Sequence, residues 1–302
     1  MRYDLNLNPK TISDKDLLEM DQGYFIHLTP FISRGYRIPN GKWWKTAMTI
    51  FHIHNETINI WTHLLGFLYF IYLLLENIIY SGPERDILEI IVSNLYLTTV
   101  SSVLLNSTIY HSSISHSVSV ANRCLCNDWQ SVALLAGSSS IFNGYFELFR
   151  HGYKWEYILF VMINALTTYK VSKLCVKSVK DCSHHTSVCK DLQQDQKERE
   201  LSILQRTILS VSLALSCYLT WLIHWWKAGE LTDEMIHTII GISISYLFYG
   251  SFLLKVTSIP ERFFPNSLDI FGQSHQIFHI GAFIGAYAGW MAYRPYMLFQ
   301  KE

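Results

Sequence analysis

The feature that most constrains this chain is a series of apolar stretches long enough to cross a membrane. A spanning helix needs about 20 mostly apolar residues, because each residue advances ~1.5 Å through roughly 30 Å of hydrocarbon. The sequence of 302 residues supplies these stretches at 57–80, 87–111, 129–149, 155–173, 204–226, 235–255 and 273–293. It therefore predicts an all-α fold, a bundle of seven transmembrane helices.

The composition agrees with a membrane protein. Half of the residues are apolar and only 16% are charged. The formal net charge is zero, so the chain lacks the basic excess that nucleic-acid binding requires, and no nucleic-acid partner is expected. The first residues are polar and do not resemble a signal peptide, so we expect an internal segment to direct insertion into the membrane.

The distribution of basic residues predicts the orientation. With the N-terminus in the cytoplasm, 18 of the 24 Lys and Arg residues lie on the cytoplasmic side and 6 on the other. Basic residues gather on the cytoplasmic side of membrane proteins, so we expect a cytoplasmic N-terminus and an extracytoplasmic C-terminus. The expected organisation is a cytoplasmic tail over 1–50, a membrane domain over 51–296 and a C-terminal tail over 297–302.

One long polar loop interrupts the membrane domain at residues 174–203. It is rich in charge and contains neither Gly nor Pro, which fits either a short cytoplasmic helix or a disordered insertion. Cys175, Cys182 and Cys189 recur there at intervals of seven residues. Their spacing lacks the CxxC pattern of zinc-binding knuckles, so reduced cytosolic thiols are the favoured interpretation.

Polar side chains at the ends of three predicted spans are the candidates for chemistry. Ser107 and His111 stand one helical turn apart at the end of the second span, and Asp128 directly precedes the third. His275 and His279 stand one turn apart at the start of the seventh span. In the predicted orientation these three helix ends share one depth, near the cytoplasmic interface, so the five side chains are expected to converge.

Three imidazoles and a carboxylate at one depth indicate a Zn²⁺ site. Zinc accepts nitrogen and carboxylate ligands, and a bound cation offsets the cost of burying the rings. We expect His111, His275 and His279 to be the metal ligands. Asp128 would act as general base on a water, and Ser107 would be a hydroxyl donor near the reacting group.

Each of these side chains also fits a simpler role when taken singly. A lone His at a helix end is more often a hydrogen-bonded interfacial group, and Asp128 alone fits a helix N-cap. Glu56 and His63, at the start of the first span, are assigned to packing or capping. Glu147 and His151, at the far end of the third span, are assigned to the interface.

These residues carry a family resemblance. The pattern Ser107-x3-His111, Asp128 and His275-x3-His279 resembles the progestin and adipoQ receptor family, which includes the adiponectin receptors and belongs to the haemolysin III superfamily. The stretches HNETINIWTHLLGF (54–67) and SIPERFFPNSLDIFGQSHQIFH (258–279) are similar to the family's entry into helix 1 and its loop into helix 7. Within the family the chain is most similar to the fungal Izh branch.

The resemblance implies a fold, a metal and two functions. It implies a multi-pass protein of the endoplasmic reticulum or plasma membrane, with zinc held by the three histidines and Asp128 near the metal-bound water. It favours a zinc-dependent hydrolase of a lipid amide such as ceramide, linked to zinc, lipid and sterol homeostasis, with a membrane lipid as substrate. The alternative is a receptor or regulator with a structural zinc and an extracellular protein as ligand.

Overall fold

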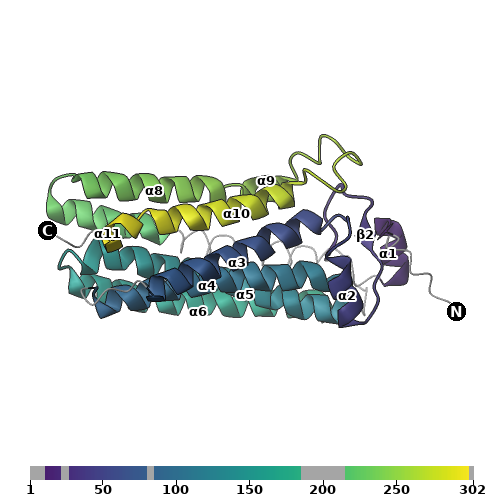
Figure 1. The fold of residues 1–302 in the computed structure, drawn as a ribbon, viewed down its shortest axis with the longest axis horizontal. Coiled ribbons are helices and arrows are strands. Elements are labelled where there is room, and N and C mark those ends of the chain that lie inside the picture. Colours follow the sequence, from purple (N-terminus) through teal and green to yellow (C-terminus); the bar gives the residue numbers. More distant parts are fainter. Residues whose placement is uncertain (1–10, 22–26, 80–84, 185–214, 299–302) are drawn as a thin grey trace.

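The computed structural model describes residues 11–21, 27–79, 85–184 and 215–298, with the backbone alone described over 175–184. Its long helices run side by side along one axis, and the N-terminal segment and the loop before α10 meet at one end (Figure 1). Residues 215–228 are also helical. The other elements are β1 (Thr11–Ile12), α1 (Asp14–Met20), β2 (Tyr36–Arg37), α2 (Trp43–Thr49), α3 (Thr57–Ile79), α4 (Ile87–Ser113), α5 (Val118–Gly144), the π-helix η2 (Tyr145–Phe149), α6 (Lys154–His184), α8 (Asp233–Tyr249), α9 (Phe252–Thr257), α10 (Ser274–Met291) and α11 (Arg294–Leu298).

Helices α3, α4 and α10 agree closely with the predicted segments 57–80, 87–111 and 273–293. Within the described residues, three helical segments are long and apolar enough to cross a membrane: α3, α4 and the stretch Asp233–Thr257. The all-α character is therefore confirmed, whereas the number of seven spans and the orientation of the termini stay predictions.

The faces of these helices reverse the pattern of a soluble protein. Large apolar side chains such as Leu65, Tyr72 and Ile79 are exposed on the outside of α3. Polar side chains on α3 and α4, such as Asn59 and Ser101, are buried between helices. This distribution suits a bundle whose surroundings are hydrocarbon, because polar groups there must find partners inside the protein.

Helix α5 begins earlier than predicted. It starts at Val118, after the N-cap residue Ser117, so Asp128 lies within the helix and not at its N-cap. The added turns are ordered because Val118, Cys124 and Leu125 belong to an apolar cluster with the N-terminal segment and the end of α4. That packing involves segments distant in the sequence, so hydropathy alone does not report it.

Helix α6 also exceeds its prediction and continues to His184. The first part of the expected loop 174–203 is therefore helical, and the rest, with Cys189, lies outside the described residues. Of the predicted span 204–226, only residues from 215 onward are described, and these are helical.

The predicted span 235–255 is divided at Gly250 and Ser251 into α8 and α9. A stripe of glycines on α10 faces this break. A Cβ at Gly281 would lie 2.2 Å from Ser251 Oγ, and one at Gly285 would lie 2.9 Å from the Ser245 backbone oxygen. Small residues at four-residue spacing thus let the backbones of α8 and α10 approach, as is common between membrane helices.

Candidate metal centre

The three predicted ligands meet. His111 comes from the last turns of α4, and His275 and His279 from the first turns of α10. One ring nitrogen from each of the three lies within 4.8 Å of the others. The distances between ring centroids are 5.0 Å for His111 and His275, 4.7 Å for His111 and His279, and 4.8 Å for His275 and His279. Such a cluster of three imidazoles, two of them buried and His275 partly buried, can hold a metal ion.

The loop before α10 fixes where that helix begins. The Glu261 carboxylate accepts hydrogen bonds from the backbone nitrogen of Ser274 (2.8 Å) and from its hydroxyl. Gln276 accepts from the Gly272 nitrogen (2.8 Å) and donates to the Ile270 oxygen (2.7 Å). The bond from Glu261 satisfies the Ser274 amide, one of those that the first turn of a helix leaves without partners, and the Gln276 bonds hold the loop against that turn. They therefore set the position of the two histidines that follow.

Glu56 orients His111. Its Oε2 lies 2.7 Å from Nδ1 of His111, and the Asn59 side-chain nitrogen donates to the same oxygen at 2.6 Å. A carboxylate that accepts a hydrogen bond from Nδ1 leaves the lone pair of Nε2 available to bind a metal. This arrangement is common among metal-binding histidines. The structure thus gives Glu56 a more specific role than packing or capping. The sequence does carry a signal for this role, because the spacing of Glu56, Asn59 and His63 places them on one helical face.

His63 stacks on His279. The ring centroids lie 3.9 Å apart, and Nε2 of His63 is 3.3 Å from the His279 backbone oxygen. Within the described part of the chain, the buried Nδ1 atoms of both rings have no hydrogen-bond partner. A buried nitrogen without a partner is costly, and at His279 it lies beside two other imidazoles. This donor set fits Zn²⁺.

A buried arginine ties the N-terminal segment to the end of α4. Arg37 is 4% exposed; it donates to Thr49 Oγ1 at 2.9 Å and to the His111 backbone oxygen. Burial lowers the pKa of Arg37 to about 10, so the guanidinium stays charged at neutral pH. This contact was not predicted because nothing in the sequence around Arg37 marks its partner.

The other two predicted site residues are near the cluster, and within the described residues neither makes a hydrogen bond to its rings. Asp128 is partly buried on α5 and interacts electrostatically with His111 and with Lys255 of α9. Ser107 is buried one turn before His111 on α4. Lys255 was missed because a basic residue at the end of a predicted span is ordinarily assigned to the membrane interface.

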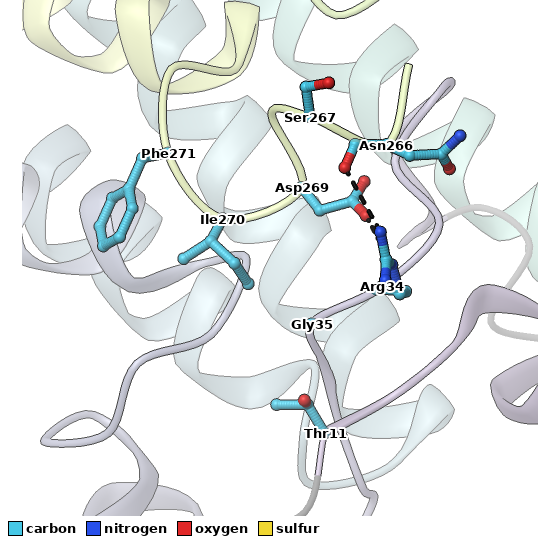
Figure 2. Close-up of a pocket in the computed structure, with 8 residues that line it drawn as sticks. All are labelled: Thr11, Arg34, Gly35, Asn266, Ser267, Asp269, Ile270 and Phe271. Atoms are coloured by element: carbon cyan, nitrogen blue, oxygen red, sulfur yellow. Dashed lines mark hydrogen bonds and ion pairs between the residues drawn. The ribbon is translucent and has the colours of Figure 1, made fainter. Parts of the chain in front are cut away.

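A separate hollow of about 360 Å³ lies between the N-terminal segment and the loop before α10. Figure 2 shows Arg34 beside Asp269, whose Oδ2 lies 3.3 Å from the arginine Nε. The Asp269 carboxylate also accepts from the Ser33 backbone nitrogen at 3.0 Å. None of the three histidines lines this hollow, so its polar residues serve to join the two segments.

Comparison with known proteins decides the family. A family model described as haemolysin-III related matches residues 51–290. The chain belongs to the haemolysin-III-related family. Together with its long apolar helices, this membership makes it a multi-pass integral membrane protein.

Relatives of this haemolysin-III-related protein occur in several kingdoms. It is 29% identical over 252 residues to the adiponectin receptor protein of Drosophila melanogaster, covering 83% of this chain and 52% of the relative. It is 25% identical over 265 residues to human progestin and adipoQ receptor family member 3, covering 85% and 78%. It is 26% identical over 263 residues to the ADIPOR-like receptor IZH2 of Saccharomyces cerevisiae, covering 85% and 76%.

These relatives confirm the resemblance to the progestin and adipoQ receptors, while the narrower assignment to the fungal Izh branch stays a prediction because the identities are so similar. The chain spans about half the length of the fly protein and of an uncharacterized protein from Schizosaccharomyces pombe, at 52% and 54%.

Proposed function

We propose that His111, His275 and His279 hold a Zn²⁺ ion and that the protein hydrolyses a lipid amide of the ceramide type. The observation that carries this proposal is the convergence of three ring nitrogens within 4.8 Å, beside the buried Glu56 carboxylate. Zinc bound there would make a water acidic enough to attack at neutral pH and would polarise the amide carbonyl.

The side chains of the site divide the remaining work. Asp128 accepts a proton from the attacking water and returns it to the amide nitrogen as the carbon–nitrogen bond breaks, which releases a fatty acid and an amine. Ser107 supplies a hydroxyl for the carbonyl oxygen, on which negative charge develops. Glu56 holds the His111 ring in place. The acyl chain enters sideways between helices from the membrane.

The test compares full-length protein with an Asp128→Asn variant, both purified and loaded with zinc, for release of fatty acid from ceramide. Loss of a general base lowers turnover by about 100- to 10,000-fold, and metal content should not change. An exposed residue outside the site, Asp21, provides the matched control Asp21→Asn. Equal release by the Asp128→Asn variant with its zinc retained would contradict the assigned base.

A receptor with a structural zinc is the second candidate. The names of the fly, human and yeast relatives all contain the word receptor, and this favours a receptor function. In that case the three histidines join α4 to α10, and removal of zinc would unfold the protein. Zinc-loaded protein that releases no fatty acid, and that loses its thermal transition on chelation, would support this function and exclude the hydrolase.

A further inference from the structure

A second cluster of histidines and carboxylates lies at the opposite end of the bundle. His275 is at the start of α10, which runs about 24 Å to Met291 at ~1.5 Å per residue. Just beyond that end, the Tyr293 hydroxyl donates to Glu147 Oε1 at 3.0 Å. Glu147 Oε2 accepts from Nδ1 of His224 at 2.8 Å. Both Glu147 and His224 are buried, at 2% and 3% exposure.

The Glu147–His224 pair repeats the arrangement of Glu56 and His111. In each pair a buried carboxylate accepts from Nδ1 and leaves Nε2 of the imidazole available. A structural hydrogen bond alone would not require the second imidazole and second carboxylate that stand next to it.

Those neighbours are His151 and Glu234. The His151 ring centroid lies 3.9 Å from that of His224, at an angle of 35°. Nε2 of His151 is 3.9 Å from Glu234 Oε1, and both side chains are partly exposed. Two imidazoles and a carboxylate form one of the ligand sets that zinc accepts in proteins. His151 and Glu234 lie at the edge of the bundle, where an ion can enter, while His224 is buried.

The local backbone is specialised at the same place. Glu147 lies in η2, where the Arg150 nitrogen bonds the Tyr145 oxygen (3.0 Å), five residues back. This π-helical turn changes the direction of the side chains relative to a continued α-helix, and such turns are frequent at functional sites. It places Glu147 against His224 and brings His151 to the same edge.

We propose that His151, His224 and Glu234 form a second, exchangeable site for a divalent transition-metal ion, with Zn²⁺ as the expected ligand. Zinc–nitrogen bonds of about 2.0–2.1 Å place two donors roughly 3.4 Å apart in tetrahedral geometry. The His151 and Glu234 donors must therefore move closer than 3.9 Å, and the His151 ring must turn out of its contact with His224. These movements make the site weaker than the three-histidine cluster.

Arg150 opposes binding in this site. Its Nη1 lies 3.5 Å from Glu234 Oε1, so an incoming cation must displace a positive charge. The proposal consequently predicts that an Arg150→Met variant binds the metal more tightly. A purely structural cluster predicts no change in metal affinity from this substitution.

The experiment is a Co²⁺ titration of purified full-length protein without a polyhistidine tag, read from the visible absorption of the bound ion and checked by calorimetry with Zn²⁺. We expect one reversible equivalent, in addition to any metal retained through purification. His224→Ala should remove it, His151→Ala should weaken it at least tenfold, and Arg150→Met should tighten it. His237, which is exposed on α8 at the same end, provides the control His237→Ala.

Because His151 is at the surface, its variant gives a result even where His224→Ala fails to fold. Reversible binding that is unchanged in His151→Ala, or no reversible equivalent below millimolar Co²⁺, would overturn the proposal. The proposed hydrolase is tested separately, because His111→Ala should lose the retained metal and keep the reversible equivalent. Loss of both equivalents in His111→Ala would show that the second site does not exist independently.

Discussion

The two ends of the bundle differ in the partners that they provide for buried histidine side chains. At one end, three ring nitrogens already lie within 4.8 Å of one another, and buried Nδ1 atoms of His63 and His279 lack partners in the described residues. At the other end, Glu147, His224 and Tyr293 satisfy one another, while His151 and Glu234 are partly exposed. The first arrangement is ready for a metal, and the second must rearrange to bind one.

This difference predicts two kinds of metal binding in one molecule. A preformed cluster that costs free energy when empty should retain its ion through purification, since binding relieves unpaired buried nitrogens. A cluster whose members already bond to one another must break those contacts first, which lowers its affinity. The orienting carboxylates, Glu56 and Glu147, are the residues through which the comparison is tested most directly.

The largest effect is expected from Glu56→Gln compared with Glu147→Gln. Removing the carboxylate behind a metal-binding histidine weakens metal affinity by about 10- to 100-fold. Glu56→Gln should therefore lose retained zinc, measured by elemental analysis after dialysis against a chelator at increasing concentration. Glu147→Gln should leave the retained zinc unchanged, because Glu147 lies in η2, at the opposite end of the bundle from the three histidines.

The control for this comparison is Glu76→Gln, which removes an ion pair between α3 and Arg294 outside both clusters. Equal zinc retention in Glu56→Gln and the unaltered protein would mean that the Glu56–His111 bond is only a structural contact. Zinc loss in Glu147→Gln would mean that the two ends do not act separately.

The second comparison concerns how tightly α10 packs at each end. A methyl group at Gly281, near the three histidines, would lie 2.2 Å from Ser251 Oγ and 2.6 Å from the Phe248 backbone oxygen. A methyl group at Gly289, toward the other end, would find its nearest atom at 3.1 Å, the Tyr96 hydroxyl. Overpacking costs typically 1–3 kcal/mol.

Gly281→Ala should therefore lower the thermal unfolding midpoint in detergent and Gly289→Ala should lower it less. Retained zinc should fall in Gly281→Ala alone, because a shift of α10 at that end moves His279. A larger destabilisation by Gly289→Ala would show that the far end, and not the end with the three histidines, sets the packing of this helix.

Much of the three-histidine end could be predicted from the sequence because its histidines obey helical spacing. His275 and His279 are one turn apart in a clearly apolar stretch, and the ends of adjacent spans share a depth. The residues that sequence reasoning missed act across long separations. Glu56 bonds to a residue 55 positions away, and Arg37 to one 74 positions away. Periodicity within one helix carries no information about such pairs.

The departures in the fold have the same origin. Helix α5 gains its first turns from packing on the N-terminal segment, and the break between α8 and α9 lies opposite the glycine stripe of α10. Hydropathy reports how apolar a stretch is and does not report its neighbours. At the far end, Glu147 and His151 were assigned to the interface because His224 lies on another helix, far along the chain.

The smallest effect is a pH dependence confined to the end of the bundle with the three histidines. His27 is 5% exposed; its Nδ1 lies 3.2 Å from the Tyr110 hydroxyl and its Nε2 lies 2.9 Å from Asn122 Oδ1, so it fastens the N-terminal segment to α4 and α5. Burial lowers the pKa of His27 to about 4. The folded state then prefers the neutral ring, and its stability is complete above the unfolded pKa and falls as the pH drops from about 6.5 toward 4.

Between pH 7.4 and 6.0 this linkage amounts to roughly 1 kcal/mol. Acidification should therefore speed amide hydrogen exchange in residues 27–37, after correction for the intrinsic rates. A His27→Gln variant should lose that pH dependence, because the amide does not titrate, while exchange in α11 stays the same in both proteins. If the variant responds to pH as the unaltered protein does, another group controls the attachment of this segment, and His27 is not an acid-sensitive contact at the three-histidine end.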